Sequence, residues 1–358
     1  MTTIESVQVR PLDLPLREPF EIALGVQKSA KNLLVRIETG DGVVGVGEGS
    51  PLAPVTGETR ESAVQIAHAA GELITGESLG DYRHLIETVR ETFPGNGAAL
   101  MAIEIAILDA YCRYHELPLA ALFGGEPTAI RTDMTVPIVE PSVAAQRARD
   151  AVERGYNRIK IKCGVAVDES IKRVTAVADA VPDATLTVDA NQGFSPAETE
   201  QFAEAVGEAG VTLAMIEQPV AASDVHGMAD IRSALTVPIG ADEAVFTPAD
   251  AMTICRNDAA DVLNLKLAKS GLLDNAAIAA VARAADREVM IGCMLESAVG
   301  VHASAHLVSG LGGVSHVDLD ANRLLADDVR AAKTGPEIDL EGPGHGVDPY
   351  VVWKAGNS

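Results

Sequence analysis

The chain has 358 residues, of which 47% are hydrophobic, and a formal net charge of −23 at pH 7. This charge argues against nucleic acid as a partner, and the sequence has no run of roughly 18 apolar residues that could cross a membrane. The four cysteines are scattered and the first residues do not resemble a signal peptide, so we expect a cytoplasmic protein with free thiols.

The first 125 residues predict an α+β domain. Residues 4–12 alternate between apolar and polar side chains, and residues 32–49 predict a hairpin that turns at Asp41-Gly42. From about residue 60 to residue 122, apolar residues recur at helical spacing, and Gly124-Gly125 end the last helix. We therefore place one domain at residues 1–125 and expect the chain to hold at least one more.

After about residue 130, short β-branched runs alternate with alanine-rich helical segments. Strands are predicted at residues 132–138, 158–163, 185–190, 212–218, 238–242, 261–267, 288–294 and 313–320. Eight strands separated by seven helices predict a closed parallel barrel over residues 126–324. A doubly wound open sheet is the alternative, but no G-x-G-x-x-G motif follows a first strand. We expect the tail, residues 325–358, to return to the N-terminal domain.

Carboxylates end three neighbouring strands of this barrel, at the edge where parallel barrels hold their active sites. Asp189, Glu217 and Asp242 end the third, fourth and fifth strands. Oxygen ligands without His or Cys suit Mg²⁺, with Mn²⁺ as the alternative. A salt bridge or a helix N-cap explains any one of these residues, but three of them together predict a metal site.

Lysine is scarce in this chain, with nine residues, yet four of them lie in two short segments: Lys160, Lys162, Lys266 and Lys269. Lys162 and Lys266 end the second and sixth strands, which face each other across an eight-stranded barrel. Two opposed lysines beside a metal can remove a proton next to a carboxylate on one face and return it on the other. A solvated basic strand is the alternative for Lys160 and Lys162, and we expect Lys269 at the surface or behind the site.

Six runs of the sequence resemble the enolase superfamily, in the muconate-lactonizing-enzyme-like subgroup. They are RIKIK (158–162), VDANQG (188–193), IEQP (216–219), GADEA (240–244), NLKLAKSG (264–271) and GCMLES (292–297). The resemblance covers nearly the whole chain and implies a modified TIM barrel, (β/α)₇β, capped by the N-terminal domain and the tail. It also implies Mg²⁺ held by the three carboxylates, with Lys162 and Lys266 as the acid/base pair.

Other residues near the strand ends complete the predicted site. We assign Lys160, Thr135 and Glu296 to substrate binding, and we place Asn191 behind the metal ligands. The expected partner is a small molecule, and we expect the protein to form a homo-oligomer.

The run HVDLDAN (316–322) resembles the Asp-x-Asp motif of dipeptide epimerases, in which two carboxylates hold the α-ammonium group of the substrate. Asp318 and Asp320 share one side of a strand and form an anionic pocket for a cation. An aspartate turn that closes the eighth strand is the structural alternative. The resemblance therefore implies a dipeptide that is epimerised at its second residue.

One departure bears on the choice of dipeptide. In family members specific for Ala-Glu, an arginine in the first capping loop meets the substrate's side-chain carboxylate, and Gly25 stands in the matching place here. We therefore expect Gly25 beside the substrate and an uncharged second residue in the preferred dipeptide, unless Lys28 or Lys31 replaces the arginine.

Three activities of the same subgroup are alternatives: o-succinylbenzoate synthase, muconate cycloisomerase and N-acylamino acid racemase. The substrates of the first two are anionic and carry no ammonium group, so two aspartates at the Asp-x-Asp position would repel them. A non-catalytic metal-binding protein on a retained barrel is a further alternative. The lysine pair argues against it, because such a protein has no need of two opposed bases.

Overall fold

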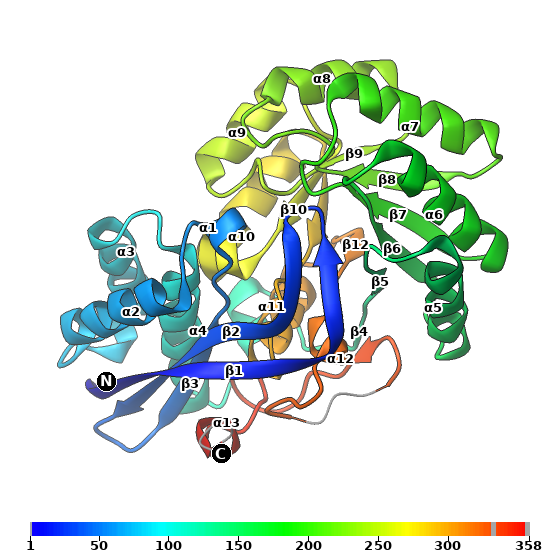
Figure 1. Cartoon of the computed structure of the whole chain (residues 1–358). Coiled ribbons are helices and arrows are strands. Elements are labelled where there is room, and N and C mark those ends of the chain that lie inside the picture. The colour runs from blue at the N-terminus through cyan, green and yellow to red at the C-terminus, as the bar shows by residue number, and fades with distance from the viewer. Residues whose placement is uncertain (1, 331–333, 355–358) are drawn as a thin grey trace.

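In a computed structural model that describes residues 2–330 and 334–354, eight parallel strands form one curled sheet (Figure 1). In chain order they are β5 (Met134–Val136), β6 (Arg158–Lys162), β7 (Thr185–Asp189), β8 (Leu213–Glu217), β9 (Ile239–Ala241), β10 (Val262–Leu265), β11 (Glu288–Ile291) and β12 (His316–Val317). Each strand pairs with the next one along the chain. The Asp133 amide donates to the Val317 carbonyl at 3.0 Å, which brings the last strand beside the first. The predicted barrel is confirmed, and the unbroken strand order excludes the doubly wound alternative.

Seven helices alternate with these strands between residues 134 and 317, all of which the structure describes. They are α5 (Pro141–Glu153), α6 (Val167–Ala180), α7 (Pro196–Glu208), α8 (Val225–Ala234), α9 (Pro248–Arg256), α10 (Leu267–Ala284) and α11 (Ala298–Leu311). Capping boxes start two of them, with Ser195 before α7 and Thr247 before α9. Several strands end earlier than predicted. Asp242, Lys266 and Asp318 lie one residue beyond the ends of β9, β10 and β12, at the mouth of the barrel.

The N-terminal domain consists of an antiparallel sheet covered by helices. Its strands are β1 (Ile4–Ile22), β2 (Gly25–Thr39) and β3 (Val44–Gly49), and its helices are α1 (Ala53–Thr56), α2 (Arg60–Ile74), α3 (Tyr82–Thr92) and α4 (Gly97–Tyr114), with 3₁₀ turns η1 (Leu79–Asp81) and η2 (Leu119–Phe123). The turn at Asp41-Gly42 is confirmed, and Gly42 has a φ of 78°, which favours glycine.

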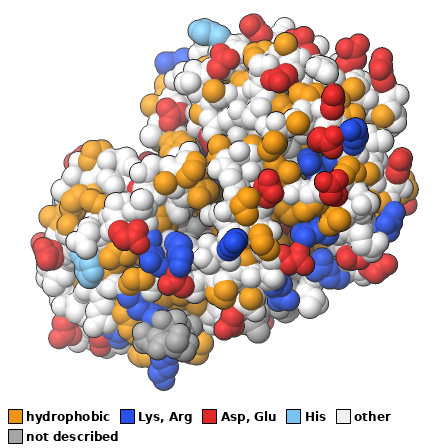
Figure 2. Space-filling view, viewed as in Figure 1, with side chains coloured by type: hydrophobic (Ala, Val, Ile, Leu, Met, Phe, Trp, Pro, Cys, Tyr) orange, Lys and Arg blue, Asp and Glu red, His pale blue; other side chains and the backbone are white. Residues whose placement is uncertain are grey.

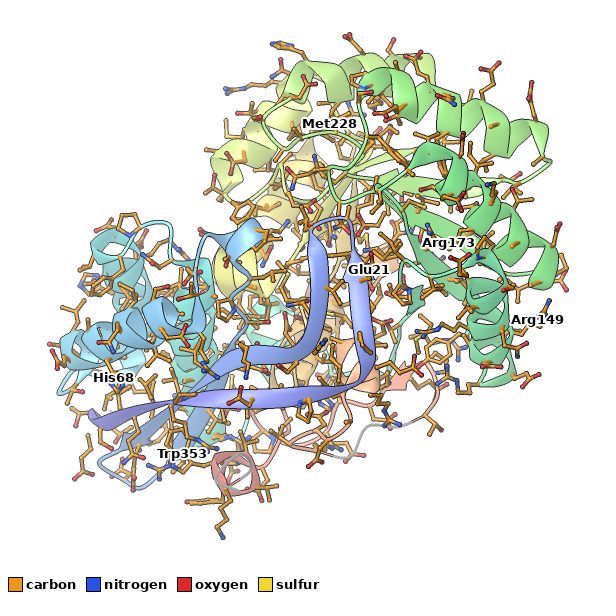
Figure 3. All side chains as sticks on the ribbon, in the orientation of Figure 1. Glu21, His68, Arg149, Arg173, Met228 and Trp353 are labelled. Carbon is orange, nitrogen blue, oxygen red and sulfur yellow. The ribbon has the colours of Figure 1, made fainter. Side chains whose placement is uncertain are left out.

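The strands β1 and β2 are much longer than predicted, because they continue past the sheet as a two-stranded hairpin (Figure 1). Pro11 and Pro15 lie within β1, where they are tolerated because β1 is an edge strand. The tip of the hairpin reaches the barrel, where the Ile138 amide donates to the Glu21 carbonyl at 3.0 Å. Figure 3 labels Glu21 at this end of the hairpin, which therefore covers the mouth of the barrel.

The tail contacts both parts of the molecule. It follows α12 (Ala321–Leu324) and contains β13 (Glu337–Ile338), which pairs with β4 (Ile130–Arg131), and α13 (Pro349–Lys354). Near its end the His345 amide donates to Asp109 of α4 at 3.1 Å, and Arg10 lies 4.7 Å from the centre of the Trp353 ring (Figure 3). The division of the chain at residues 125 and 324 remains a prediction. Among the helices of residues 2–330 and 334–354, none is long and apolar enough to cross a membrane.

Three glycines, Gly45, Gly47 and Gly49, let β3 pack directly on the backbone of α4. A Cβ added at Gly47 would lie 2.1 Å from the Ala102 carbonyl oxygen, and a Cβ added at Gly45 would lie 2.4 Å from the Ala106 carbonyl oxygen. We expect Gly47→Ala to lower the free energy of unfolding by about 1–3 kcal/mol, because backbone atoms cannot move away as a side chain can. Urea denaturation measures this change.

The matched control for Gly47→Ala is Gly207→Ala, at an exposed position within α7 where an added Cβ meets nothing within 4 Å. This change should raise the free energy of unfolding by about 0.5–1 kcal/mol, because alanine favours a helix interior over glycine. Equal effects of the two substitutions would contradict the close packing of β3 on α4.

Candidate active site

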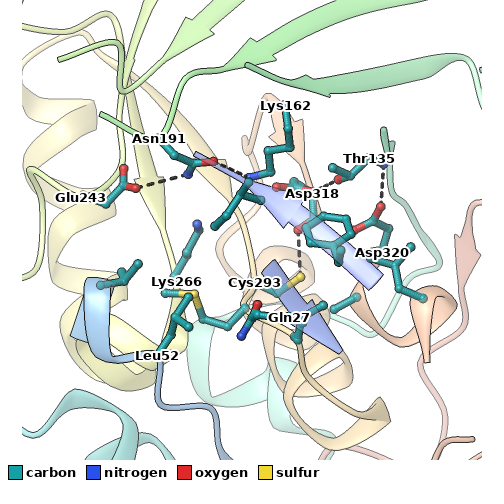
Figure 4. A pocket seen from close by; sticks show the side chains of 17 residues that line it. Gln27, Leu52, Thr135, Lys162, Asn191, Glu243, Lys266, Cys293, Asp318 and Asp320 are labelled. Carbon is teal, nitrogen blue, oxygen red and sulfur yellow. Dashed lines mark hydrogen bonds between the residues drawn. The ribbon is translucent and has the colours of Figure 1, made fainter. Parts of the chain in front are cut away.

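A pocket lies between the carboxyl ends of the barrel strands and the β1–β2 hairpin (Figure 4). The barrel and the segment after it supply seven polar lining residues, which are Thr135, Lys162, Asn191, Glu243, Lys266, Asp318 and Asp320. The hairpin, the α1 segment and the segments after β11 and β12 supply Phe20, Ile22, Gln27, Leu52, Val55, Cys293, Met294, Leu295, Ala321 and Leu324. One wall of the pocket is therefore charged and the other is mainly apolar.

Two lysines reach this pocket from strands that lie four apart in the barrel. Lys162 is the last residue of β6, and its Nζ donates to Asp189 Oδ2 at 2.7 Å and to Asn191 Oδ1 at 3.2 Å. Lys266 follows β10 and caps α10, and its Nζ donates to Asp242 Oδ2 at 2.5 Å. Figure 4 shows both side chains directed into the pocket. The structure thus brings together the two lysines that the sequence assigns to proton transfer.

The three predicted metal ligands lie behind the lysines, fully buried. Asp189 and Glu217 pair in register on β7 and β8, and Asp242 follows β9, so all three come from neighbouring strands. Burial alone would raise the pKa of Asp189, but the ammonium groups of Lys162 and Lys160 hold it below its usual range.

Glu217 differs from its neighbours, because burial and then the negative charge of Asp189 raise its pKa to about 7. Glu243, next in sequence to Asp242, has its pKa raised to about 8 by burial and then by Asp242, and its Oε2 has no hydrogen-bond partner among the described residues. The negative charges of these buried carboxylates repel one another, and a divalent cation would relieve that repulsion. The all-oxygen donor set therefore fits Mg²⁺ or Mn²⁺.

Lys160 lies one layer below Lys162 on the same side of β6. Its Nζ lies 2.6 Å from Asp318 Oδ2, 2.7 Å from Glu217 Oε2 and 3.1 Å from Asp189 Oδ2. The side chain is 1% exposed and does not line the pocket, so its predicted contact with substrate has no counterpart in this structure. The Lys160 ammonium therefore lies between two predicted metal ligands, Asp189 and Glu217, and Asp318 of the Asp-x-Asp pair.

Asp318 and Asp320 follow β12, beyond the end of the strand, and both line the pocket. Thr135 holds them together: its amide donates to Asp320 Oδ2 at 2.6 Å and its hydroxyl donates to Asp318 Oδ1 at 3.3 Å. Burial and then the charge of Asp318 raise the pKa of Asp320 to about 6, whereas Lys160 overcomes burial to lower the pKa of Asp318. Lys160 pairs with Asp318, and no ion pair with Asp320 occurs among the described residues, so this end of the pocket suits a cation.

Asp133 is a third carboxylate in this cluster that the sequence analysis missed. Its oxygens and those of Asp318 and Asp320 lie within 4.8 Å of one another, and Asp133 Oδ1 is buried without a partner among the described residues. Asp133 lies immediately before β5 and two residues from Thr135, and this spacing was the available signal. This cluster could also hold an ion, whereas the predicted triad lies behind the two lysines, with Asp189 bonded to Lys162 and Asp242 bonded to Lys266.

The remaining predicted residues lie in different places. Glu296 is buried behind the pocket, where its Oε1 accepts from the Met294 amide at 2.9 Å and burial raises its pKa to about 8. Gly25 is exposed at the tip of the hairpin with a φ of 134° and does not line the pocket, whereas Gln27 does. Asn191 does line the pocket, and its Nδ2 donates to Glu243 Oε1 at 3.2 Å.

Lys269 is not at the surface, so that part of its prediction is wrong. Its Nζ donates to Asp242 Oδ1 at 2.8 Å and to the Asp242 and Asn264 carbonyls at 2.7 and 2.8 Å. Desolvation by burial lowers its pKa, although Asp242 opposes this effect. Lys269 therefore gives Asp242 a second positive partner. Glu243, which follows Asp242 in the sequence, lines the pocket, and the sequence analysis did not single it out.

Comparison with known proteins identifies both parts of the chain. Residues 4–124 match the mandelate racemase/muconate lactonizing enzyme N-terminal domain, and residues 143–350 match the enolase C-terminal domain-like family. An aromatic dipeptide epimerase of Herpetosiphon aurantiacus is 34% identical over 97% of this chain and 99% of its own length. An L-Ala-D/L-Glu epimerase of Bacillus subtilis is 33% identical over 97% of both chains.

A solved structure agrees with these relatives. The dipeptide epimerase of Enterococcus faecalis, crystallised with Mg and the dipeptide L-Leu-L-Tyr, superposes with a TM-score of 0.93 and 34% identity over 96% of this chain and 99% of that one. The match covers nearly the whole of both chains, so it is a likeness of the whole architecture. This chain belongs to the mandelate racemase/muconate lactonizing enzyme family, with the N-terminal domain of that family followed by an enolase C-terminal domain-like barrel.

Proposed function

We propose that this protein is an isomerase that epimerises the second residue of an L,L-dipeptide. One observation carries the proposal: Lys162 and Lys266 reach the same pocket from opposed strands, and Asp318 and Asp320 line that pocket as a site for a cation. A dipeptide supplies both groups that this arrangement needs, an α-ammonium and a carbon acid beside a carboxylate. Relatives named as dipeptide epimerases, at about one-third identity over nearly the whole chain, support the same conclusion.

In the proposed reaction the neutral amine of one lysine removes the α-proton, and the ammonium of the other donates a proton to the opposite face. The stereocentre is thereby inverted, and the reverse reaction uses the two groups in exchanged roles. Asp189, Glu217 and Asp242 would hold Mg²⁺, with Mn²⁺ as the alternative, which supplies positive charge to stabilise the enolate formed from the substrate carboxylate. Asp318 and Asp320 position the dipeptide by its ammonium group.

The aspartate pair should decide the substrate class. A charge-assisted contact with an ammonium contributes roughly 1.5–3 kcal/mol, so Asp320→Asn should lower kcat/KM for dipeptides by about 10- to 100-fold. The asparagine can still accept from the Thr135 amide, so the fold around it should persist. N-acetylation of the substrate should have a comparable effect on the wild type, because it removes the positive charge. Steady-state kinetics with Ala-Leu and its N-acetyl form measure both effects.

The pH profile provides a second readout of Asp320. Because its pKa is raised to about 6, its negative charge is lost as the pH falls through 6, and kcat/KM should fall with it. This limb of the profile should disappear in Asp320→Asn. Asp327→Asn, at an exposed position on the same segment, is the matched control and should keep both the rate and the profile. Equal turnover of free and N-acetylated substrate would exclude the ammonium contact.

The pocket favours an uncharged second residue. Its cap side is formed by Phe20, Ile22, Leu52 and Val55, with Gln27 as the polar exception. Lys31 is instead paired with Asp13 at 2.5 Å on the exposed hairpin, and Lys28 is exposed and outside the pocket wall.

A substrate comparison tests this preference. We expect kcat/KM for Ala-Leu and Ala-Phe to exceed that for Ala-Glu by about tenfold or more, because burying a charged side chain against an apolar wall is unfavourable. Measurement on Ala-Leu, Ala-Phe, Ala-Lys and Ala-Glu decides the order. A clear preference for Ala-Glu would mean that a basic group outside the apolar wall meets the substrate.

Two further expectations belong to this proposal. The four free cysteines are consistent with a cytoplasmic enzyme, which cell fractionation can test. We also propose a homo-oligomer, and light scattering at several protein concentrations measures its size.

A further inference from the structure

A second cavity adjoins the active-site pocket at the β1–β2 hairpin. Phe20, Thr135 and Leu324 line both cavities, so the two spaces share a wall at the end that holds Asp318 and Asp320. The second cavity lies between β1, the first barrel strand, α5 and α12. Its other lining residues are Arg17, Glu18, Pro19, Met134, Val136, Arg147, Asp150, Arg154 and Arg323.

Four arginines face two carboxylates in this cavity, although the chain as a whole carries a net charge of −23. Figure 2 shows acidic side chains scattered over both lobes of the visible face, which makes a local excess of arginine unusual. Glu18 neutralises only Arg147, with which it forms an ion pair. The cavity therefore has a local positive charge.

The other three guanidinium groups are positioned mainly by uncharged oxygens. Arg17 Nε donates to the Leu325 carbonyl at 2.8 Å, Arg154 Nε to the Asp150 carbonyl at 3.0 Å, and an Arg323 Nη to the Glu337 carbonyl at 3.0 Å. Carbonyl contacts orient a guanidinium but leave its charge in place. Within the described ranges, Arg17, Arg154 and Arg323 form no ion pair with a carboxylate. An anion entering the cavity would thus meet preoriented donors.

We propose that this cavity binds an acidic side chain on the first residue of the dipeptide, so that peptides of the type Glu-X and Asp-X are substrates. The inference rests on the proposed function, because it takes the α-ammonium to lie at Asp318 and Asp320. Thr135 donates to both aspartates and also lines the arginine cavity. The side chain next to that ammonium would therefore reach the arginines by passing the shared wall of Phe20, Thr135 and Leu324.

The charge of the two cavities complements such a substrate. The aspartates attract the ammonium at one side of Thr135, and the guanidinium groups attract the side-chain carboxylate at the other. Guanidinium groups suit a carboxylate because they donate two parallel hydrogen bonds to it. The second residue of the dipeptide lies toward the apolar wall, so the two side chains are selected independently.

The test compares Glu-Leu with Gln-Leu, which match in shape and differ in charge, with Ala-Leu as the reference. We expect kcat/KM for Glu-Leu to exceed that for Gln-Leu by about five- to tenfold at low salt, and the ratio to fall as salt screens the charges. Arg17→Gln, and Arg17→Gln combined with Arg154→Gln, should reduce the ratio toward one. Arg149→Gln is the matched control, because Arg149 lies on the outer side of α5 and lines a different cavity (Figure 3).

The outcomes separate this inference from the proposed function. Equal kcat/KM for Glu-Leu and Gln-Leu in the wild type, with Ala-Leu still turned over, overturns the acidic side-chain site and leaves the epimerase proposal intact. A Glu-Leu preference that survives the double arginine substitution also overturns it, because the preference then arises elsewhere. If no dipeptide, Ala-Leu included, is turned over, the proposed function itself fails. A circular dichroism spectrum and melting temperature like those of the wild type confirm that each variant is folded.

Discussion

Replacing either Lys162 or Lys266 with alanine should abolish net epimerisation of an L,L-dipeptide. General acid and base groups each contribute about 10²–10⁴-fold to such reactions, so the loss should be of at least that order. The fold should survive, because each buried carboxylate keeps one lysine: Asp189 keeps Lys160 in the first variant, and Asp242 keeps Lys269 in the second. Chiral chromatography of the reaction mixture measures the loss.

The two variants should also differ from each other. The lysine that remains still faces one side of the α-carbon, so each variant should exchange the α-proton of one epimer with solvent while making no product. Lys172→Ala is the control, since that lysine is exposed on α6 and its one ion-pair partner among the described residues is Glu169. Full epimerisation in either variant would rule out the opposed pair of bases.

Removing divalent metal should abolish activity, and adding Mg²⁺ back should restore it. Charge stabilisation by a bound metal is worth several kcal/mol, which corresponds to about 10³-fold or more in rate. Asp242→Asn should weaken metal binding as well. It also leaves Lys266 and Lys269 without their carboxylate, so circular dichroism must accompany the metal titration. Isothermal titration calorimetry measures the affinity, and activity after chelation measures the dependence.

The control for Asp242→Asn is Asp81→Asn, at an exposed position in the N-terminal domain. This variant should bind metal and turn over substrate as the wild type does. Undiminished activity after metal content has been shown to be zero would contradict the role of Asp189, Glu217 and Asp242. Equal metal affinity of the two variants would place the ion elsewhere, and the cluster of Asp133 with the Asp-x-Asp pair would then be the first place to look.

The barrel and its charged edge could be predicted from sequence because both depend on local patterns. The alternation of strands and helices predicts a parallel barrel, and such a barrel brings its strand ends together whatever the details of packing. Lys162, Asp189 and Glu217 end their strands as predicted. Lys266 and Asp242 lie one residue beyond the ends of their strands. Their place near the other three could still be predicted, because it depends only on where each strand stands in the barrel.

The rest of the site depends on contacts that no local pattern encodes. The hairpin that closes the pocket contains three prolines in β1, which argue against a strand until its edge position is known. Phe20 and Leu52 reach the pocket only because that hairpin and the α1 segment fold over the barrel. Lys269 lies in the first turn of α10, between Lys266 and the kink at Gly271 with its φ of 71°, and this turn places its ammonium on Asp242. Single residues at such turns carry no periodic signal.

The measurement that bears most directly on the proposed function is isotope exchange during turnover. Ala-Leu and Ala-Phe are incubated with the protein and Mg²⁺ in deuterated water, and the products are separated by configuration and weighed by mass spectrometry. We expect the L,D product to carry one deuterium at the α-carbon of the second residue and none at the first. Absence of both exchange and inversion with every free dipeptide, together with activity on an N-acylated amino acid or a muconate, would contradict dipeptide epimerisation and leave only the family assignment standing.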